Sequence, residues 1–357
     1  MLIEHQRVKQ IDFFRKEKND IFYEIIYEQR KLKRQYLYER GSETYDDIMM
    51  IKIGKGKFIG VGECSPFPSF FGWSLDRVLS DLKNWADFIL LGDEHHKLYD
   101  SSISSPAQSG INLALIDLKC QQMDQAVYDL YNLGGLNDIT ISHTVEYEQL
   151  GVLQTRLTEM TALPILKVKL GSDGLDRERL ILVRQCAPNA TIIVDVNEGW
   201  TFSYLKELMP FLLESNVKMI EQPLKRGEDF SLADYQSPIP IYADESFSNL
   251  SDLNVLSKCY DGFNVKLDKV GGLTNALNII HHCKQMSKGI MLGCLGGTSL
   301  LSTAGFIAAQ SADFVDLDNH LWLCQDRDPS LGGEDGIIKV PQHWLWGSGR
   351  KIHVISS

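Results

Sequence analysis

From Asp138 onward, the chain alternates short runs of apolar and β-branched residues with longer amphipathic stretches. An alternation of strands and helices predicts a parallel sheet, and strands that are apolar on both faces are typical of a sheet covered on both sides. Eight such strands with intervening helices close into a barrel. The pattern therefore predicts an α/β fold, a modified TIM barrel of the (β/α)7β type. The eight runs are 139–141, 165–169, 192–195, 219–221, 241–244, 263–266, 290–293 and 314–316.

The first part of the chain has a different pattern, in which strand-like runs come before two helical stretches. Strands are predicted at 21–27 and 48–53, and Gly-Lys-Gly-Lys at 54–57 predicts a hairpin turn into a further strand. Amphipathic stretches at 74–91 and 109–123 predict helices. The expected organisation is an α+β domain over 1–125, the barrel over 126–325, and a C-terminal segment over 326–357 that returns to the first domain.

Composition narrows the class of partner. The formal net charge is −11, and such an acidic chain is a poor ligand for nucleic acid or an anionic membrane. The N-terminus lacks the apolar core of a signal peptide, and no run of about 18 apolar residues could cross a bilayer. The seven Cys are scattered and form no CxxC pair, which favours reduced thiols over disulfides or a zinc site. We therefore expect a cytoplasmic protein with a small-molecule partner.

Five predicted strands end in a charged residue at regular spacing. Lys169, Asp195, Glu221, Asp244 and Lys266 are separated by 26, 26, 23 and 22 residues, which matches the length of one βα unit. A lone Asp or Lys after a strand is usually a helix cap or a solvated loop residue. Five in succession, one in each unit, predict instead that the side chains meet at the carboxyl ends of the strands, where TIM barrels carry their active sites.

The three acidic residues of this series predict a metal site. Carboxylates that converge without a cation repel one another and raise each other's pKa. Mg²⁺ is a hard cation that prefers oxygen ligands. Asp195, Glu221 and Asp244 are therefore the expected ligands of a Mg²⁺ ion, with water and substrate oxygens completing its coordination.

The two lysines of the series are expected on opposite sides of the barrel mouth. A Lys can act as a base when burial and a nearby cation lower its pKa. Two bases on opposite faces of one carbon can remove a proton on one side and return it on the other. A proton next to a carboxylate is very weakly acidic, and metal coordination stabilises the enediolate that forms. Lys169 and Lys266 are thus the predicted catalytic bases of a racemase or epimerase.

These motifs resemble those of the muconate-lactonising subgroup of the enolase superfamily. The resemblance spans the barrel from about Ser142 to Trp346, and residues 60–66 resemble part of the family's N-terminal α+β capping domain. It implies a Mg²⁺-dependent, homo-oligomeric enzyme. The matching motifs are Lys167-Val168-Lys169, Asp195-Val196-Asn197, Glu221-Gln222-Pro223, Ala243-Asp244-Glu245-Ser246 and Asn264-Val265-Lys266.

One motif narrows the implied substrate to a dipeptide. Asp316-Leu317-Asp318 resembles the D-x-D with which dipeptide epimerases hold the α-ammonium group of the substrate. Alternate strand residues share a face, and two carboxylates can receive one ammonium, whereas the alternative is an acidic pair on the surface. Residues 293–299 resemble the branch that contains L-Ala-D/L-Glu epimerases and N-acyl-glutamate racemases. Further substrate-binding residues implied by the resemblance are Lys167, Ser142 and Thr298.

Two loops of the capping domain are expected to select the substrate. Residues 32–42 resemble the family's mobile first loop, where an Arg can pair with an acidic side chain, and Arg40 is the candidate. The alternative is a solvated cluster of basic residues. The second loop, 68–73, is aromatic and lacks an Arg, which leaves room for an apolar side chain.

Several functions fit this sequence. The first is a dipeptide epimerase that inverts the α-carbon of the C-terminal residue by two-base 1,1-proton transfer through a metal-stabilised enediolate. The alternatives on the same scaffold are an N-acylamino acid racemase and a lyase of the o-succinylbenzoate synthase type. The lyase would need the metal and the lysines but not Asp316 and Asp318. A non-catalytic barrel is disfavoured because every expected acid, base and ligand is present.

Overall fold

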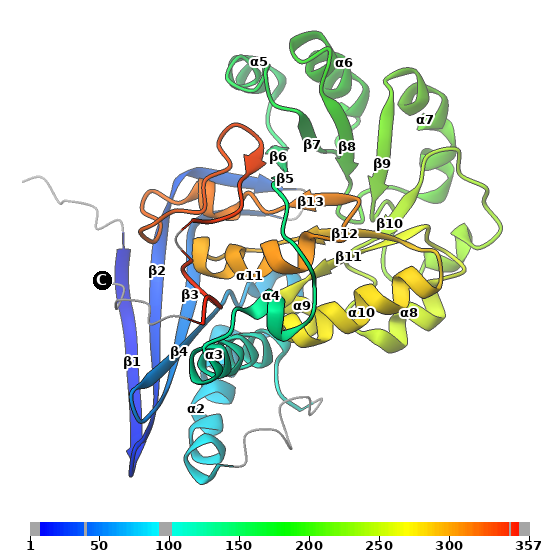
Figure 1. Cartoon of the computed structure of the whole chain (residues 1–357). Helices are drawn as coiled ribbons and strands as arrows, with labels where there is room; N and C mark the ends of the chain where they lie inside the picture. Colours follow the sequence, from blue (N-terminus) through cyan, green and yellow to red (C-terminus); the bar gives the residue numbers. More distant parts are fainter. Residues whose placement is uncertain (1–7, 39–40, 93–101, 343, 350–357) are drawn as a thin grey trace, which may run out of the picture.

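The computed structural model describes residues 8–38, 41–92, 102–342 and 344–349. They form an antiparallel sheet with its own helices and, beside it, an eight-stranded parallel barrel surrounded by helices (Figure 1). The predicted α/β class, with a (β/α)7β barrel and an N-terminal α+β domain, is confirmed. No helix in the described ranges is long and apolar enough to cross a membrane. All seven Cys are free thiols.

The N-terminal sheet has four antiparallel strands in sequence order. Its first strand was not expected, because it lies at the sheet edge with most side chains exposed and so contains no apolar run. The predicted hairpin is present, and Gly56 occupies its turn with a φ of 59° that favours glycine. The strands are β1 (Val8–Lys18), β2 (Ile21–Tyr38), β3 (Gly41–Lys55) and β4 (Phe58–Cys64).

Strands β2 and β3 are much longer than expected. Most of residues 32–42, which resemble a loop, belong to these strands. The two strands stay paired as far as Tyr38 and Gly41, beyond a shift in register between Lys31 and Tyr36. The polar residues of this region do not form an apolar run, but their backbone groups satisfy one another across the pair. The sequence pattern was therefore a poor guide to strand length here.

The outer part of this hairpin, residues 32–38 and 41–46, is called the hairpin arm below. It contacts the barrel at several places. Leu32 forms an isolated β-bridge with Leu323, and the Tyr147 N–H donates to the carbonyl of Leu37 at 3.3 Å. The arm is thus fixed beside the carboxyl ends of the barrel strands.

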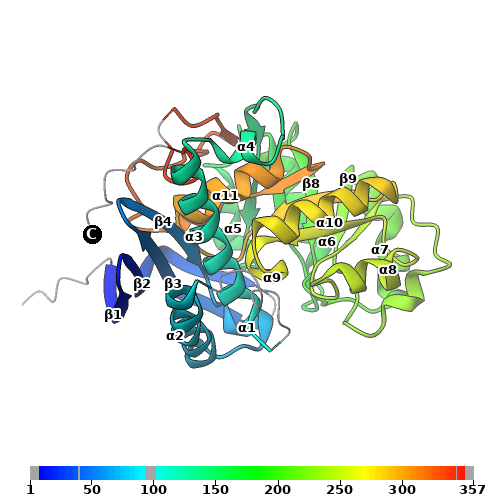
Figure 2. The same cartoon turned by 60° about the horizontal axis from the view of Figure 1, so that its bottom comes forward.

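Two long helices cover one face of the N-terminal sheet (Figure 2). Helix α3 touches β4 directly, since a Cβ on Gly62 would lie 2.1 Å from the Gly110 carbonyl oxygen and one on Gly60 would lie 2.1 Å from that of Ala114. Helix α3 begins before the predicted residue 109, with a proline in its first turn, a position that suits proline. The helices are α1 (Pro68–Phe71), α2 (Leu75–Leu91), α3 (Ser105–Met123) and α4 (Val127–Leu130).

The barrel strands run parallel and follow one another around the ring in sequence order. The first and last strands approach each other, and the Ser142 hydroxyl donates to the carbonyl of Val315 at 3.3 Å. The strands are β6 (Ser142–Val145), β7 (Ile165–Lys169), β8 (Thr191–Asp195), β9 (Val217–Glu221), β10 (Ile241–Ala243), β11 (Gly262–Lys266), β12 (Gly289–Gly293) and β13 (Phe314–Asp316).

The first predicted barrel strand was misplaced by a few residues. Strand β5 (Ile139–Thr140) pairs antiparallel with β14 (Ile337–Ile338) outside the barrel. The strand that enters the barrel is β6, whose Ser142 side chain and Thr144 backbone are hydrogen-bonded to the chain after β12. The apolar run at 139–141 did not mark the barrel strand, because Ser142 and Thr144 are held in that strand by hydrogen bonds and not by apolar packing.

Helices follow the barrel strands and cover the outside of the ring (Figures 1 and 2). Strands β8 and β10 are each followed by an α-helix, but β9 is followed by a short 3₁₀ helix. A second short 3₁₀ helix follows β13. The elements are α5 (Leu150–Leu157), α6 (Asp176–Cys186), α7 (Phe202–Glu214), η1 (Asp229–Leu232), α8 (Leu250–Leu256), α9 (Leu267–Val270), α10 (Leu273–Gln285), α11 (Ser299–Ala309) and η2 (Asn319–Trp322).

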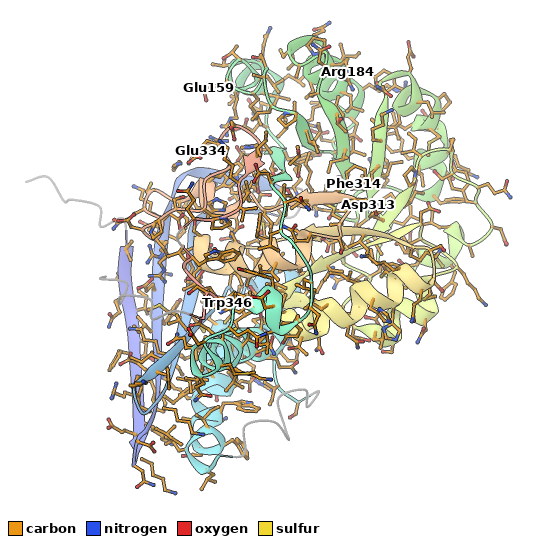
Figure 3. The ribbon with its side chains drawn as sticks, in the orientation of Figure 1. Glu159, Arg184, Asp313, Phe314, Glu334 and Trp346 are labelled. Carbon is orange, nitrogen blue, oxygen red and sulfur yellow. The ribbon has the colours of Figure 1, made fainter. Side chains whose placement is uncertain are left out.

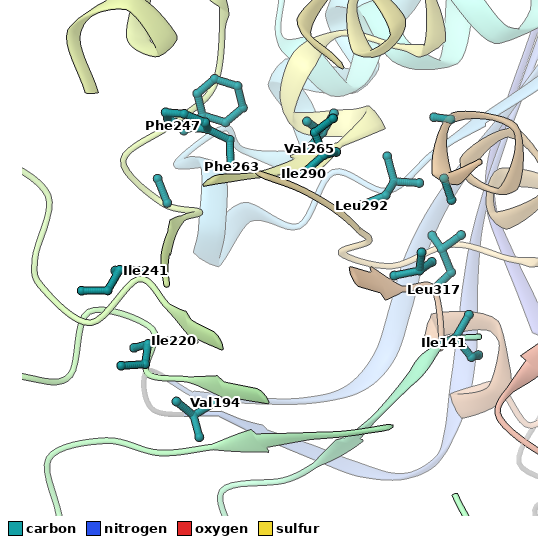
Figure 4. Packing of buried hydrophobic residues seen from close by; sticks show 14 of the residues in the cluster. Ile141, Val194, Ile220, Ile241, Phe247, Phe263, Val265, Ile290, Leu292 and Leu317 are labelled. Atoms are coloured by element: carbon teal, nitrogen blue, oxygen red, sulfur yellow. The ribbon is translucent and has the colours of Figure 1, made fainter. Parts of the chain in front are cut away.

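Successive residues of each barrel strand point alternately inward and outward. Outward side chains such as Val194, Ile220 and Val265 pack in the core shared with the helices (Figure 4). A second apolar cluster fills the amino-terminal end of the barrel interior, and it contains Ile193, Met219, Tyr242 and Met291, with Ile165 and Phe314 packed against it. Two residues further along, the inward position is charged in every one of these strands except β12, where it is Gly293. The strand period thus places the charges inside the barrel, above an apolar floor.

The chain after β13 returns to the N-terminal domain. The Arg327 guanidinium lies 3.1 Å from the carboxylates of both Glu28 in β2 and Glu63 in β4. The indole of Trp346, labelled in Figure 3, donates to the carbonyl of Leu113 in α3 at 3.0 Å. These contacts tie the C-terminal segment to the capping domain, while the exact domain limits stay a prediction.

Candidate active site

The five regularly spaced charges come together at the carboxyl end of the barrel. Lys169, Asp195, Glu221 and Lys266 are the last residues of β7, β8, β9 and β11, and Asp244 follows β10. Each has an exposed fraction of 6% or less. Lys169 pairs in register with Asp195, which pairs with Glu221, so the side chains stand next to one another around the ring.

The two lysines stand on opposite sides of the barrel. In the ring of eight strands, β7 and β11 are four positions apart, the largest separation that such a ring allows. Lys169 Nζ donates to Asp195 Oδ2 at 2.7 Å, and Lys266 Nζ donates to Asp244 Oδ2 at 2.7 Å. The carboxylates of β8, β9 and the β10 loop occupy the arc between the two ammonium groups.

The three carboxylates of this arc have the donor chemistry of a Mg²⁺ site. Lys167 Nζ lies 3.0 Å from Asp195 Oδ2 and 2.9 Å from Glu221 Oε2, so ammonium groups lie between the acids in this arrangement. Within the described ranges, no three His, Cys, Asp or Glu side chains surround a common point. All three acids are nevertheless fully buried and offer only oxygen atoms. A buried, anionic, oxygen-only set fits a hard divalent cation.

The acids and bases of the site set one another's charge. Burial, and then repulsion from Asp195 and Asp244, raises the pKa of Glu221 to about 7. Burial acts in the same direction on Asp195, but the neighbouring lysine ammonium groups outweigh it and lower the pKa of this residue. Burial opposes the charge of Lys266, but the Asp244 carboxylate outweighs it and raises the pKa of the lysine. The neighbouring positive charge is therefore what keeps the Asp195 carboxylate ionised.

Three polar residues that the sequence did not single out support this centre. Asn197 Oδ1 accepts a hydrogen bond from Lys169 Nζ at 2.9 Å, and Asn264 Nδ2 donates to the β9 carboxylate at 2.7 Å. Lys269, in α9, donates to Asp244 Oδ1 at 2.6 Å. Asn197 and Asn264 lie within the charged motifs, so their role at this centre could have been predicted from the sequence. The role of Lys269 could not, because only its burial in the structure distinguishes it from a solvated lysine.

Asp316 and Asp318 lie across the barrel from the β9 carboxylate, on β13 and just after it. Ser142 Oγ donates to Asp316 Oδ1 at 2.8 Å, and Lys167 Nζ donates to Asp316 Oδ2 at 2.7 Å. The Thr144 N–H donates to Asp318 Oδ2 at 2.9 Å. The predicted acidic pair is thus inside the barrel mouth, and Ser142 and Lys167 hold one of its members.

One of the predicted substrate-binding residues, Thr298, does not line the cavity at the barrel mouth. Thr298 is buried where the two domains meet, and its N–H and hydroxyl donate to Glu63 Oε1 at 2.6 and 2.9 Å. It caps α11 and does not line the cavity, although the nearby Gly296 does. Thr298 could therefore affect a substrate only indirectly, by fixing the position of the loop that contains Gly296. Arg40 lies outside the described residues.

A cavity opens above the strand ends, between the barrel and the hairpin arm. It holds about 840 Å³ of space between atoms, the open solvent at its mouth included. Its floor carries Lys167, Lys169 and Lys266 together with the β13 acids. Its walls are rich in aromatic side chains: Tyr36, Tyr38, Tyr45, Phe67, Phe70 and Trp322.

A family model for the enolase C-terminal domain-like family matches residues 153–351, which is more than half of the chain. The match contains the five charges of the strand ends and both β13 acids. Strand β6 and the capping domain lie outside it.

Two curated relatives extend the match. An N-acetyl-D-glutamate racemase from a Pseudoalteromonas species is 35% identical over 254 residues, which cover 71% of this chain and 80% of the relative. The L-Ala-D/L-Glu epimerase of Escherichia coli K12 is 30% identical over 312 residues, which cover 87% of this chain and 96% of the epimerase.

Solved structures agree with these relatives. An enolase family member from Agrobacterium tumefaciens with homology to dipeptide epimerases, bound to sodium and L-Ala-L-Glu, is 32% identical with a TM-score of 0.87, covering 92% of this chain and 100% of that one. A dipeptide epimerase from Cytophaga hutchinsonii, complexed with Mg and D-Ala-L-Val, is 29% identical with a TM-score of 0.83, covering 92% and 94%. The chain therefore belongs to the enolase superfamily, as an isomerase of its racemase and epimerase group.

Proposed function

We propose that this protein is a Mg²⁺-dependent dipeptide epimerase that inverts the α-carbon of the C-terminal residue by two-base 1,1-proton transfer. The observation that carries the proposal is the placement of Lys169 and Lys266 on strands four positions apart, facing one cavity. Inversion at one carbon needs a proton acceptor on one face and a donor on the other. Two lysines across a barrel provide that pair, and either can start the reaction.

Asp195, Glu221 and Asp244 are the residues that would hold the Mg²⁺ ion. When bound there, Mg²⁺ supplies Lewis-acid stabilisation of the negative charge that builds up on the substrate carboxylate as the α-proton leaves. The lysines supply the proton transfer itself: one, as the neutral amine, accepts the α-proton, and the other, as the ammonium, returns a proton on the opposite face. Both side chains are positioned by short hydrogen bonds to acids of the same arc. Asn197 holds Lys169 from a second direction and so restricts where its Nζ can lie.

The two acids on and after β13 fit the N-terminal ammonium group of a dipeptide. Asp316 and Asp318 lie across the ring from the carboxylate arc, so a substrate can present its carboxylate to one side and its ammonium to the other. This orientation leaves the α-carbon of the C-terminal residue between Lys169 and Lys266. The relatives that are named dipeptide epimerases, and the Cytophaga structure with Mg and a dipeptide, support this choice of substrate and cofactor.

The test is α-proton exchange in D₂O, followed by proton NMR, with a panel of dipeptides. We expect loss of the α-proton signal of the C-terminal residue together with appearance of its epimer. Both should stop after chelation of divalent cations and return when Mg²⁺ is added back. Exchange that is indifferent to chelation would contradict the metal role, and exchange confined to the N-terminal residue would contradict the orientation.

A second candidate is an N-acylamino acid racemase, and the 35% identity to the N-acetyl-D-glutamate racemase favours it. Such a substrate has no free ammonium group for Asp316 and Asp318. Including N-acetylated amino acids in the panel separates the two candidates, because a racemase of this kind would prefer them to every dipeptide. A lyase of the o-succinylbenzoate synthase type would instead turn over only a cyclohexadiene substrate. Cytoplasmic location and a homo-oligomeric state stay predictions beside this proposal.

A further inference from the structure

The cavity wall above the strand ends is made of aromatic rings that pack on one another. The ring centroid of Tyr36 lies 5.9 Å from that of Tyr38 and 4.8 Å from that of Trp322. Tyr38 in turn lies 6.2 Å from Phe67. Rings that hold one another in this way form a surface of fixed shape. Such a surface can bind an apolar group or, through the negative faces of its rings, a cation.

One ring of this wall is held in a strained position. Phe67 has a φ of 35° and a ψ of 69°, a left-handed conformation that a bulky residue rarely adopts. The same short segment carries Phe70, whose ring centroid lies 4.8 Å from Lys266 Nζ. The segment therefore reaches from the proposed base to the ring wall. Strain of this kind is kept where a ligand-binding geometry depends on it.

A carboxylate lies within the aromatic wall. Glu43, on the hairpin arm, lines the cavity, and its Oε1 accepts a hydrogen bond from the Tyr38 hydroxyl at 3.3 Å. None of the described Lys or Arg residues forms an ion pair with Glu43, and burial raises the pKa of this carboxyl group. A partly buried carboxylate that faces a cavity, with no cation beside it among the described residues, can bind one.

Among the described residues that line the cavity, no basic side chain is available to pair with Glu43. The described basic residues that line the cavity are Lys167, Lys169 and Lys266, and each is already paired with an acid of the floor. An acidic substrate side chain would have to be buried near Glu43 without a described basic partner in the walls, which is unfavourable. An apolar side chain would fit the rings but would leave the carboxylate unpaired.

We propose that the site selects dipeptides whose C-terminal residue has a cationic side chain, an amine or a guanidinium, held by Glu43 and the rings around it. This substrate class rests on the proposed function, because it takes the reacting α-carbon to lie between Lys169 and Lys266. From that point a long side chain passes Phe70 and reaches the ring wall. There it meets both a carboxylate and aromatic faces, which together bind ammonium and guanidinium groups.

The test compares kcat/KM for inversion of L-Ala-L-Lys, L-Ala-L-Arg, L-Ala-L-Leu and L-Ala-L-Glu by the full-length protein with Mg²⁺. We expect the two cationic dipeptides to be preferred. Glu43→Gln keeps the size of the side chain and removes its charge, so kcat/KM for the cationic dipeptides should fall by about ten- to a hundredfold, with little change for L-Ala-L-Leu. Glu43→Arg should shift the preference toward L-Ala-L-Glu.

The matched control is Asp47→Asn, on the same strand. The Asp47 carboxylate accepts hydrogen bonds from Tyr27 at 2.7 Å and Gln29 at 3.0 Å and does not line the cavity, so its loss should leave the order of substrates unchanged. A wild-type preference for L-Ala-L-Leu or L-Ala-L-Glu, or an equal loss on all dipeptides in Glu43→Gln, would overturn the cation preference.

Failure of the proposed function gives a different result. No inversion of any dipeptide would contradict the epimerase itself rather than the shape and charge of the cavity. Titration calorimetry of L-Ala-L-Lys against the wild type and Glu43→Gln then decides the cation preference alone. Weaker binding in Glu43→Gln supports it, and equal binding, or none to either protein, contradicts it.

Discussion

Two lysines on one strand, Lys167 and Lys169, have different surroundings although both point into the barrel. Lys167 contacts acids on both sides of the ring, at Asp195 and at Asp316, whereas Lys169 contacts only Asp195 among the acids and is held by Asn197 as well. A lysine that contacts carboxylates on both sides of the ring suits substrate binding. A lysine that contacts a carboxylate on one side only suits proton transfer. Lys167 and Lys169 thus suit different roles although they lie only two residues apart on the same strand.

The clearest residue-scale prediction concerns the two bases. Lys169→Ala and Lys266→Ala should each lower the rate of epimerisation by about 10²–10⁴-fold, the usual contribution of a positioned base, with the fold intact. Exchange in D₂O measures the rate, and circular dichroism checks the fold. Lys218→Ala is the control, because Lys218 is exposed on β9 and does not line the cavity. Turnover like that of the wild type in either base variant would contradict the two-base mechanism.

The acids on and after β13 give a second residue-scale prediction. Asp316→Asn and Asp318→Asn keep the size of each side chain and remove the charge that would receive an ammonium group. Their kcat/KM should fall about tenfold or more for dipeptides and much less for N-acetylated amino acids, since only the former carry that charge. Steady-state kinetics on both substrate types measures the difference. Equal losses on both would point to a structural role, such as the hydrogen bond from Ser142.

At the scale of elements, the contact between α3 and β4 fixes the capping domain. No side chain separates the two backbones at Gly62, where an added Cβ would meet the Gly110 carbonyl at 2.1 Å. The carbonyl is backbone and cannot turn aside, so the helix would have to move. The alternation of glycine with larger residues in β4 is therefore a packing requirement.

Gly62→Ala tests this contact. We expect the free energy of unfolding to fall by about 1–3 kcal/mol because the helix must shift. Urea denaturation followed by circular dichroism measures the change. Gly151→Ala is the matched control, since nothing lies within 4 Å of a Cβ there. In helix α5 that change should instead stabilise the protein, by about 0.5–1 kcal/mol. A neutral Gly62→Ala would show that α3 and β4 are not tightly packed.

At the scale of the whole molecule, the cap and the barrel are joined by buried ion pairs. Arg327, from the segment after β13, lies between Glu28 and Glu63, and Glu63 also accepts hydrogen bonds from Thr298 in the barrel. This places the C-terminal segment, the cap and the loop after β12 in one network. Because the cavity lies between the same two parts, the network also sets the position of the hairpin arm over the strand ends.

Arg327→Ala should therefore destabilise the protein strongly. Glu28 would keep its ion pair with Arg30 at 2.7 Å, but the buried Glu63 would lose its basic partner, and breaking a buried ion pair in this way costs about 3–5 kcal/mol of the free energy of unfolding. Urea denaturation followed by tryptophan fluorescence measures the loss. The exposed pair of Arg226 with Glu198, at 3.1 Å, provides the control, and Arg226→Ala should cost no more than about 1 kcal/mol. Similar losses in both variants would contradict the assigned difference in burial.

The barrel and the position of its charges could be predicted from the pattern of residues along the chain. Both depend on local periodicity, because a strand of alternating faces places residues two apart on the same side. The spacing of Lys169, Asp195, Glu221, Asp244 and Lys266 therefore predicted their convergence, which the structure confirms as geometry. Their chemical roles remain the proposal tested above.

The contacts between segments far apart in the sequence, in contrast, are seen only in the three-dimensional structure. The exposed edge strand β1, the long hairpin arm, and the hydrogen bonds that replace an apolar run in β6 left no periodic signal in the sequence. The proposed roles of Lys269 and Glu43 depend on their neighbours in the structure. Lys269 donates to the Asp244 carboxylate, and Glu43 lies among the aromatic rings of the cavity wall. Contacts between segments far apart in the chain depend on packing across the whole molecule, and local pattern does not contain that information.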